Sequence, residues 1–257
     1  MEEVYEGFLP VRVSTFDTLI DRRGIERGNT VLISGGCGVG KTVFGLQSAY
    51  SSALNNEKSV YISLTESPEK IKKHAKINFK WDIDAMEQNG LMKVMKVDPY
   101  ELTNDINAIM QTSEDRKMIN PFPIEGTPLS LLDSKKLKLP FKPDRIILDS
   151  LSALSSTFTD KNNYRLCVQA LIDGLNRHNS LNFVMSEMEQ EPSRYVKTGV
   201  EEFLVDGVVV MYTIRKGQLR RNAIEILKLR CSDHVKEMVP YIITNEGIKL
   251  HVGEKIL

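Results

Sequence analysis

The chain has 257 residues with 34 basic and 34 acidic side chains, so its formal net charge is zero. This balance argues against a strongly basic nucleic-acid surface, although it leaves room for one local basic patch. The 41% hydrophobic share is enough for an ordinary globular core. The length suits one large domain, or at most two.

Cysteine usage and the amino terminus indicate a cytoplasmic protein. Cys37, Cys167 and Cys231 are widely separated and form no CxxC pair, which argues against a zinc site and against a disulfide framework. A reducing compartment is the default for such a chain. Met1 to Pro10 is acidic and has no long apolar run, so we expect no signal peptide. No apolar stretch reaches the length of a membrane helix, so we expect no membrane contact.

A glycine-rich run follows the first predicted strand, residues 30–34, which is short and β-branched. Apolar residues at helical spacing come directly after the run. Strand, glycine loop and helix are the arrangement that a phosphate-binding loop requires. The run matches the pattern G-x-x-x-x-G-K-[ST] at every fixed position: Gly35-Gly36-Cys37-Gly38-Val39-Gly40-Lys41-Thr42.

The chemistry of phosphate binding explains these residue types. Glycines let the backbone turn tightly and aim its N–H groups at phosphate oxygens. Lys41 supplies a positive charge for the β- and γ-phosphates, and the Thr42 hydroxyl can hold Mg²⁺. The amino terminus of the following helix favours the same anion. We therefore expect a nucleotide to be bound by Gly36, Cys37, Gly38, Val39, Gly40, Lys41, Thr42 and Val43.

Predicted strands alternate with helices along the middle of the chain. Further buried strands are expected over 59–64, 91–97, 145–149 and 181–186. Helices are expected from Ser67-Pro68 onward, over 102–113 and over 162–178. Near the carboxyl end, strands over 208–214, 222–230, 241–244 and 247–252 follow one another through short turns. This order predicts one α/β domain over 1–257: a mostly parallel sheet flanked by helices, with C-terminal antiparallel β-hairpins.

Residues 114–143 differ from the rest of the chain, because they hold five of the ten prolines and many lysines. We interpret them as a long, mobile surface insertion. A plain irregular loop is the alternative.

Two acids end predicted strands, where parallel sheets bind ligands. Asp149 closes the strand 145–149 and has the form of a Walker B acid, which would hold Mg²⁺ through water. The alternative is a helix N-cap. Glu66 follows the strand 59–64 and is our candidate for polarising the attacking water. The alternative for Glu66 is a surface acid near a helix start.

Two groups of cations lie in the predicted hairpins. Lys228 and Arg230 project from one face of a strand and could contact phosphate oxygens, in a neighbouring subunit more easily than in their own. Solvated strand charges are the alternative. A hairpin tip around Gly217 is also basic and could touch nucleic acid or an acidic partner, but a solvated turn is favoured. The cations of this tip are Arg215, Lys216, Arg220 and Arg221.

Several segments together resemble a known family. The chain is similar to the KaiC-type ATPases of the RecA superfamily, in the single-domain form often found in archaea, over nearly its whole length. The resemblance is carried by Phe16-Asp17, Gly24-Ile25-Glu26-Arg27-Gly28, Glu66-Ser67-Pro68, Leu148-Asp149-Ser150-Leu151-Ser152-Ala153-Leu154, Gly199-Val200-Glu201-Glu202-Phe203, Asp206-Gly207-Val208-Val209, and Glu225-Ile226-Leu227-Lys228-Leu229-Arg230 with His234.

The resemblance implies a RecA-like fold, ATP hydrolysis, Mg²⁺ and a homo-oligomeric ring or filament with ATP between subunits. It also implies trans contacts from Lys228, Arg230 and His234 to the neighbour's nucleotide. Two departures bear on these expectations. Thr65 stands where the family has the first of two glutamates, so we expect either slow turnover or a different handling of the water. Cys231 stands where glycine is common. Glu201-Glu202 occupies the place of a Ser-Thr phosphoacceptor pair, so self-phosphorylation is not expected.

The leading hypothesis is a Mg²⁺-dependent ATPase with its nucleotide at subunit interfaces. One alternative is a recombinase-like repair accessory protein that binds single-stranded DNA and uses ATP as a switch, although the neutral net charge does not favour nucleic acid. Another is an ATP-sensing regulatory scaffold with little turnover, which the missing glutamate favours.

Overall fold

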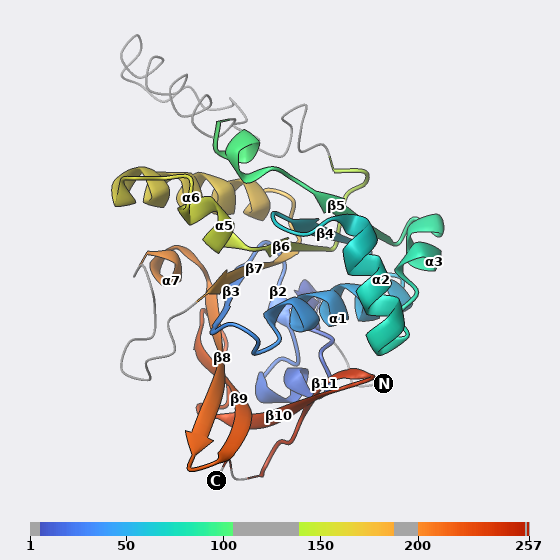
Figure 1. Cartoon of the computed structure of the whole chain (residues 1–257), viewed down its shortest axis with the longest axis vertical. Coiled ribbons are helices and arrows are strands. Elements are labelled where there is room, and N and C mark those ends of the chain that lie inside the picture. Colours follow the sequence, from blue (N-terminus) through green and yellow to red (C-terminus); the bar gives the residue numbers. More distant parts are fainter. Residues whose placement is uncertain (1–5, 105–138, 188–199, 255, 257) are drawn as a thin grey trace.

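A computed structural model describes residues 6–104, 139–187, 200–254 and 256. Their main feature is a nine-stranded sheet of order β11-β10-β9-β8-β3-β7-β6-β4-β5 (Figure 1). From β8 to β5 all neighbouring strands are parallel, whereas β8 to β11 are antiparallel. The strands are β3 (Thr30–Gly35), β4 (Ser59–Ser63), β5 (Met92–Lys96), β6 (Arg145–Asp149), β7 (Leu181–Glu187), β8 (Gly207–Lys216), β9 (Leu219–Leu229), β10 (Val239–Thr244) and β11 (Gly247–Leu250). A separate small sheet pairs β1 (Phe8–Leu9) with β2 (Ile25–Glu26).

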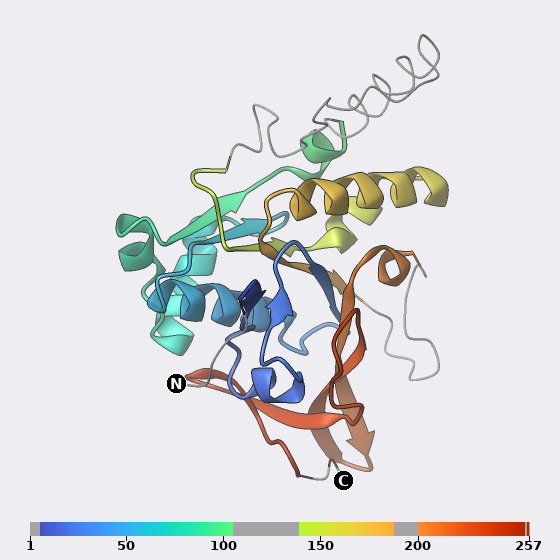
Figure 2. The same cartoon turned by 180° about the vertical axis from the view of Figure 1, so that it is seen from behind.

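Helices cover both faces of the sheet (Figures 1 and 2). Successive strand residues point to opposite faces, so the core is split in two: Val31 and Ile33 belong to one cluster, Leu32 to the other. The first face carries α1 (Lys41–Leu54), α2 (Pro68–Phe79), α3 (Ile83–Gln88) and the short helix η1 (Phe16–Leu19). The second carries α5 (Leu151–Ser155) and α6 (Lys161–Asn176), with α7 (Glu201–Leu204) against α6. Among the described residues, no helix combines the length and the apolar character needed to span a membrane.

The predicted fold class is confirmed, including the antiparallel hairpins at the carboxyl end. Ser67 caps α2, since its hydroxyl accepts a hydrogen bond from the backbone N–H of Lys70. The helix expected over 102–113 begins earlier, at residue 99, because the Asp98 carboxylate accepts the N–H groups of Tyr100 and Glu101. Its continuation from residue 105, and the predicted insertion up to residue 138, lie outside the described residues.

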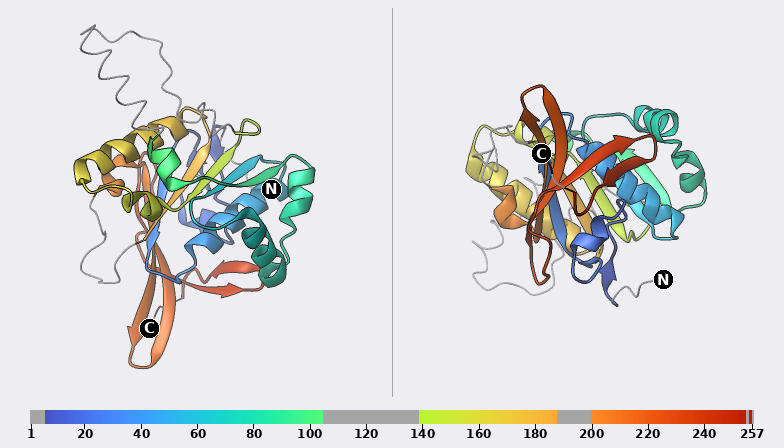
Figure 3. Two further views of the ribbon diagram at one scale, coloured as in Figure 1. Left: turned by 45° about the horizontal axis from the view of Figure 1, so that its top comes forward. Right: turned by 90° about the horizontal axis from the view of Figure 1, so that it is seen from below.

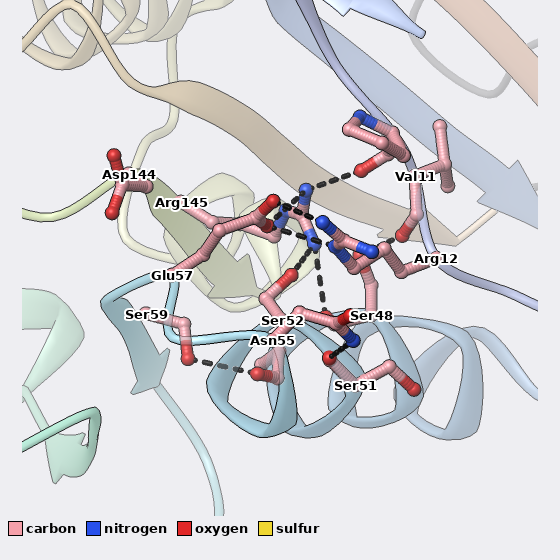
Figure 4. A network of polar contacts seen from close by, with 12 residues as sticks. Val11, Arg12, Ser48, Ser51, Ser52, Asn55, Glu57, Ser59, Asp144 and Arg145 are labelled. Atoms are coloured by element: carbon pink, nitrogen blue, oxygen red, sulfur yellow. Dashed lines mark hydrogen bonds and ion pairs between the residues drawn. The ribbon is translucent and has the colours of Figure 1, made fainter. Parts of the chain in front are cut away.

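A buried ionic network attaches the amino-terminal segment to α1 and β6 (Figure 4). Arg145 begins β6 with a fully buried side chain, and it donates to the carbonyl of Ser48 at 2.9 Å and to the hydroxyl of Ser52. The Glu57 carboxylate lies 3.6 Å from Arg145 and also accepts from Arg12 Nε at 3.0 Å. Burial lowers the pKa of Arg145 to about 10. The network contacts the carboxyl-terminal half of α1. The glycine loop leads into the amino-terminal end of the same helix.

Candidate nucleotide site

A pocket of about 270 Å³ lies at the carboxyl ends of β3, β4, β6 and β7. Its walls come from the glycine loop and from polar side chains at the ends of these strands. This position agrees with the rule that open parallel sheets bind ligands at that edge. The lining residues that matter for the chemistry are Cys37, Gly38, Gly40, Lys41, Thr42, Tyr61, Ser63, Glu66, Asp149 and Glu187.

The glycine loop joins β3 to α1 and has the backbone that its sequence predicts. Gly38 has a φ of +78° and Gly40 a φ of +102°, both in the left-handed region that favours glycine. A Cβ on Gly40 would also lie 2.6 Å from the Ile243 side chain. Three residues predicted to bind the nucleotide do not line the pocket. Val39 and Val43 pack against the core beneath the loop, and the Gly36 carbonyl accepts a hydrogen bond from Lys41.

Lys41 is the first residue of α1, directly after the loop, and only 9% of its surface is exposed. Its ammonium group donates to the carbonyls of Gly35 at 2.8 Å and Gly36 at 3.0 Å. Burial lowers the pKa of Lys41, while the negative charges of Glu187 and Asp149 act in the opposite direction. The cation is thus desolvated and placed beside the pocket, where an anion interacts with it more strongly than in water.

The Asp149 carboxylate accepts hydrogen bonds from two hydroxyl groups that also line the pocket. Thr42 Oγ1 and Tyr61 Oη each donate to Asp149 Oδ2 at 2.6 Å. Burial raises the pKa of Tyr61 well above its ordinary value, and the charge of Asp149 adds to this, so the phenol stays protonated as a donor. The N-cap of α5 is Ser150, so the side chain of Asp149 is turned to Thr42 instead of capping that helix. A threonine hydroxyl beside a carboxylate is a set of hard oxygen ligands that suits Mg²⁺.

Glu66 lines the same pocket from the turn between β4 and α2. Its backbone N–H donates to the Ser63 hydroxyl at 2.9 Å, which fixes the turn. Its carboxylate accepts a hydrogen bond from Lys70 Nζ at 2.6 Å, and 39% of the side chain is exposed. Glu66 therefore combines the two positions considered for it, at the pocket wall and in a surface ion pair at a helix start.

Comparison with known proteins decides the family. Residues 9–255 match the family model described as "ATPase: KaiC". The chain belongs to the KaiC ATPase family. The resemblance to the KaiC-like proteins of the RecA superfamily, predicted from the sequence, is thereby confirmed.

Relatives and a solved structure agree with this assignment. The chain is 29% identical over 238 residues to the circadian clock oscillator protein KaiC of Parathermosynechococcus lividus. This match covers 90% of this chain and 40% of the relative. It is also 29% identical over 238 residues to the circadian clock protein KaiC3 of Synechocystis, covering 93% of this chain and 44% of the relative. The chain thus spans about two fifths of the length of these relatives. The crystal structure of a KaiC-like protein from Pyrococcus horikoshii shares the fold, with a TM-score of 0.73, 23% identity, and coverage of 95% of this chain and 98% of that one.

Two acidic or phenolic residues of this pocket, Glu187 and Tyr61, were not among the site residues predicted from the sequence. Glu187 ends β7 directly after the predicted strand 181–186, so the rule applied to Glu66 and Asp149 would have identified it. Tyr61 lies within β4, and no local pattern indicates that its hydroxyl reaches β6.

Lys228, Arg230 and His234 lie away from the pocket of their own chain. Leu229 pairs with Gly207, and Gly207 pairs with Val31, about 13 Å along β3 from the glycine loop. Lys228 Nζ donates to two backbone carbonyls, those of Glu202 at 3.0 Å and Val205 at 2.6 Å. Arg230 pairs with Asp206 at 3.2 Å and is 54% exposed, while the backbone of His234 bridges to Ile20. In this KaiC-family chain the pocket lies at the carboxyl ends of the parallel strands, and the three residues lie near the opposite ends.

Proposed function

We propose that this chain is a cytoplasmic Mg²⁺-dependent ATPase acting as one domain over 1–257. The observation that carries the proposal is the hydrogen bond between Asp149 and Thr42, the last residue of the phosphate-binding motif. The loop amides and Lys41 hold the triphosphate, and Thr42 and Asp149 hold the metal, Asp149 through water. When bound, Mg²⁺ neutralises charge on the β- and γ-phosphate oxygens.

Glu66 polarises the attacking water in this proposal. It is the acid that follows β4 on the pocket wall, and its carboxylate accepts a hydrogen bond from Lys70. Thr65 stands beside it, so one carboxylate acts where the family commonly has two, and turnover is slow. The place of a phosphoacceptor pair is taken by Glu201 and Glu202, so no autokinase activity accompanies hydrolysis.

Nucleotides lie between subunits of a homo-oligomeric ring or filament in this proposal. The support is the position of Lys228, Arg230 and His234, which cannot reach the pocket of their own chain. Arg230 is exposed and cationic, so it suits the γ-phosphate of a neighbour.

ATP turnover by Lys41→Ala tests the site. Loss of this cation should lower turnover by about a hundredfold or more. Lys249→Ala is the matched control, because Lys249 is a surface lysine paired with Glu246. If Lys41→Ala hydrolyses ATP as well as the parent, the site is wrong. If the parent binds ATP tightly and assembles with it but does not hydrolyse it, the chain is an ATP-sensing scaffold.

Mass measurement in solution, with and without Mg²⁺ and ATP, tests the interface. Arg230→Ala should weaken assembly or turnover while nucleotide binding to the folded chain persists. Lys76→Ala is the control, since Lys76 is an exposed lysine of α2 paired with Asp82. If Arg230→Ala assembles and hydrolyses ATP as well as the parent, the proposed contact of Arg230 with the neighbouring nucleotide is wrong.

One observation favours single-stranded DNA binding as a second candidate function. The hairpin of β8 and β9 extends away from the rest of the sheet (Figure 3), and its tip exposes Arg215, Arg220 and Arg221. Arg215 lies directly opposite Arg220 across the two strands, so like charges face each other. A labelled oligonucleotide titrated at several salt concentrations tests this, because phosphate contacts give a steep salt dependence. No binding at low salt would eliminate it.

A further inference from the structure

The carboxyl-terminal hairpin makes a hydrogen bond to the glycine loop that the proposed chemistry does not use. Tyr241, in β10, donates its hydroxyl hydrogen to the backbone carbonyl of Val39. The Tyr241 side chain is buried, and burial raises the pKa of its phenol, so the group remains a donor. The two residues are far apart in the chain, so the bond ties the last strands to the loop.

The accepting carbonyl belongs to the peptide unit that joins Val39 to Gly40. A peptide unit is planar and trans, so its C=O and its N–H point in opposite directions. Fixing the Val39 carbonyl toward the core therefore fixes the direction of the Gly40 N–H. Gly40 lines the pocket, so its N–H is a donor available to a phosphate oxygen there.

The loop needs such an anchor because glycines restrict their backbone little. Gly38 and Gly40 both have positive φ, and neighbouring peptide units can rotate at low cost. Ile243 adds packing to the hydrogen bond, since it lies two residues after Tyr241 and a Cβ on Gly40 would be 2.6 Å from its Cδ1. Both side chains therefore act on the same part of the loop.

A second contact keeps the hairpin in place against α1. The Gln47 amide group donates to the Ile248 carbonyl at 3.2 Å and accepts from the Ile248 N–H at 2.7 Å. The side chain thus pairs with β11 as another strand would. The hairpin and the first turns of α1 are fixed relative to each other, so Tyr241 can act as a rigid support.

We propose that Tyr241 is a positioning residue of the phosphate site: its hydroxyl holds the Val39–Gly40 peptide so that the Gly40 N–H faces the phosphates of a bound nucleotide. The inference rests on the proposed nucleotide function. Tyr241 itself lies behind the loop and acts through Val39 without touching the nucleotide.

Tyr241→Phe tests this role, because it removes the hydroxyl and keeps the ring in the core. A fluorescent ADP analogue, titrated in the presence of Mg²⁺ well below the melting temperature, measures the affinity of the folded protein. We expect its Kd to rise by about three- to tenfold, the loss typical of one hydrogen bond. Inorganic pyrophosphate, used as a competitor, should lose affinity by the same factor.

Tyr50→Phe is the matched control. The Tyr50 hydroxyl, on α1, accepts the backbone N–H of Asp82 at 3.3 Å, away from the loop. A purely structural hydroxyl lowers the melting temperature without nucleotide and leaves the Kd of the folded protein unchanged, so Tyr50→Phe should keep the parent's Kd. Faster hydrogen exchange of the Gly40 amide in ADP-bound Tyr241→Phe than in the ADP-bound parent is a second expected result.

The outcomes separate the inference from the function beneath it. If the parent binds the ADP analogue and Tyr241→Phe binds it equally well, the positioning role is wrong and the nucleotide site stands. If ADP loses affinity in the variant but pyrophosphate does not, the hydroxyl acts on another part of the nucleotide, and the inference is again wrong. If the parent itself binds neither ligand, the proposed function fails first.

Discussion

Replacing Glu57 by glutamine should destabilise the fold by about 3 kcal/mol, because two arginines depend on this one carboxylate. Glu57 accepts from Arg12 Nε at 3.0 Å and lies 3.6 Å from the fully buried guanidinium of Arg145. Glutamine keeps the volume and one carbonyl oxygen but removes the negative charge. The variant would leave Arg145 charged and buried with its nearest countercharge lost.

The pKa of Arg145 supports the direction of this effect. Burial lowers it from 12.5 to about 10 even though Glu57 raises it, so the charged form already pays for desolvation. The buried guanidinium therefore depends on the negative charge of Glu57. Breaking a buried ion pair costs about 3–5 kcal/mol, and the retained amide oxygen places this substitution at the lower end.

Urea unfolding without nucleotide, at one protein concentration, measures the effect. The midpoint should fall with an unchanged m-value, as expected for a loss of stability within the same folded state. Glu246→Gln is the control, because Glu246 is 67% exposed and its pair with Lys249 should contribute less than about 1 kcal/mol. A loss for Glu57→Gln no larger than that of the control would refute the reasoning about the network.

Three further predictions concern the site and its surroundings. Burial raises the pKa of Glu202 from 4.5 to about 7, so the folded state keeps a proton that the unfolded chain releases, and stability falls as pH rises through this interval. Glu202→Gln lacks this loss, so between pH 5 and 8 its free energy of unfolding, measured with urea, should gain about 1 kcal/mol on the parent's after allowance for partial exposure; a constant difference would contradict this. Tyr61→Phe removes a hydrogen bond to a carboxylate, and kcat/KM for ATP should fall about tenfold or more with a higher Mg²⁺ requirement; an unchanged Mg²⁺ titration would show that Tyr61 does not orient Asp149. Glu66→Gln should lower kcat by about a hundredfold with the ADP affinity retained; an equal kcat would assign the water to another group, with Glu187 the next acid to replace.

Local patterns predicted most of the fold because they depend on neighbouring residues. The strands 30–34 and 145–149 are short apolar runs, and both lie within the observed β3 and β6. The helix start at residue 99 was missed although its signal is local, an aspartate followed by proline. The small β1–β2 sheet is different, since strands of two residues leave no period to detect.

Contacts between distant segments were predicted only where one rule covered them. The meeting of Thr42 with Asp149 followed from the loop motif and from the edge of the sheet at which parallel strands end. Tyr61 had no such rule, because its hydroxyl reaches Asp149 only through the adjacency of β4 and β6. The pairing of Glu57 with a fully buried Arg145 was likewise invisible, since charged residues are rarely buried.

The sequence by itself determined the chemistry of the glycine loop, because its glycines, Lys41 and Thr42 are contiguous and their backbone preferences are local. Only the tertiary structure decided which groups surround that loop. The order of the strands brings Tyr61 and Asp149 together and lets Tyr241 contact Val39. It also places Lys228 and Arg230 near the ends of the strands that lie opposite the pocket. Strand order depends on the packing of the two cores against the whole sheet, a property that no segment of the chain carries alone.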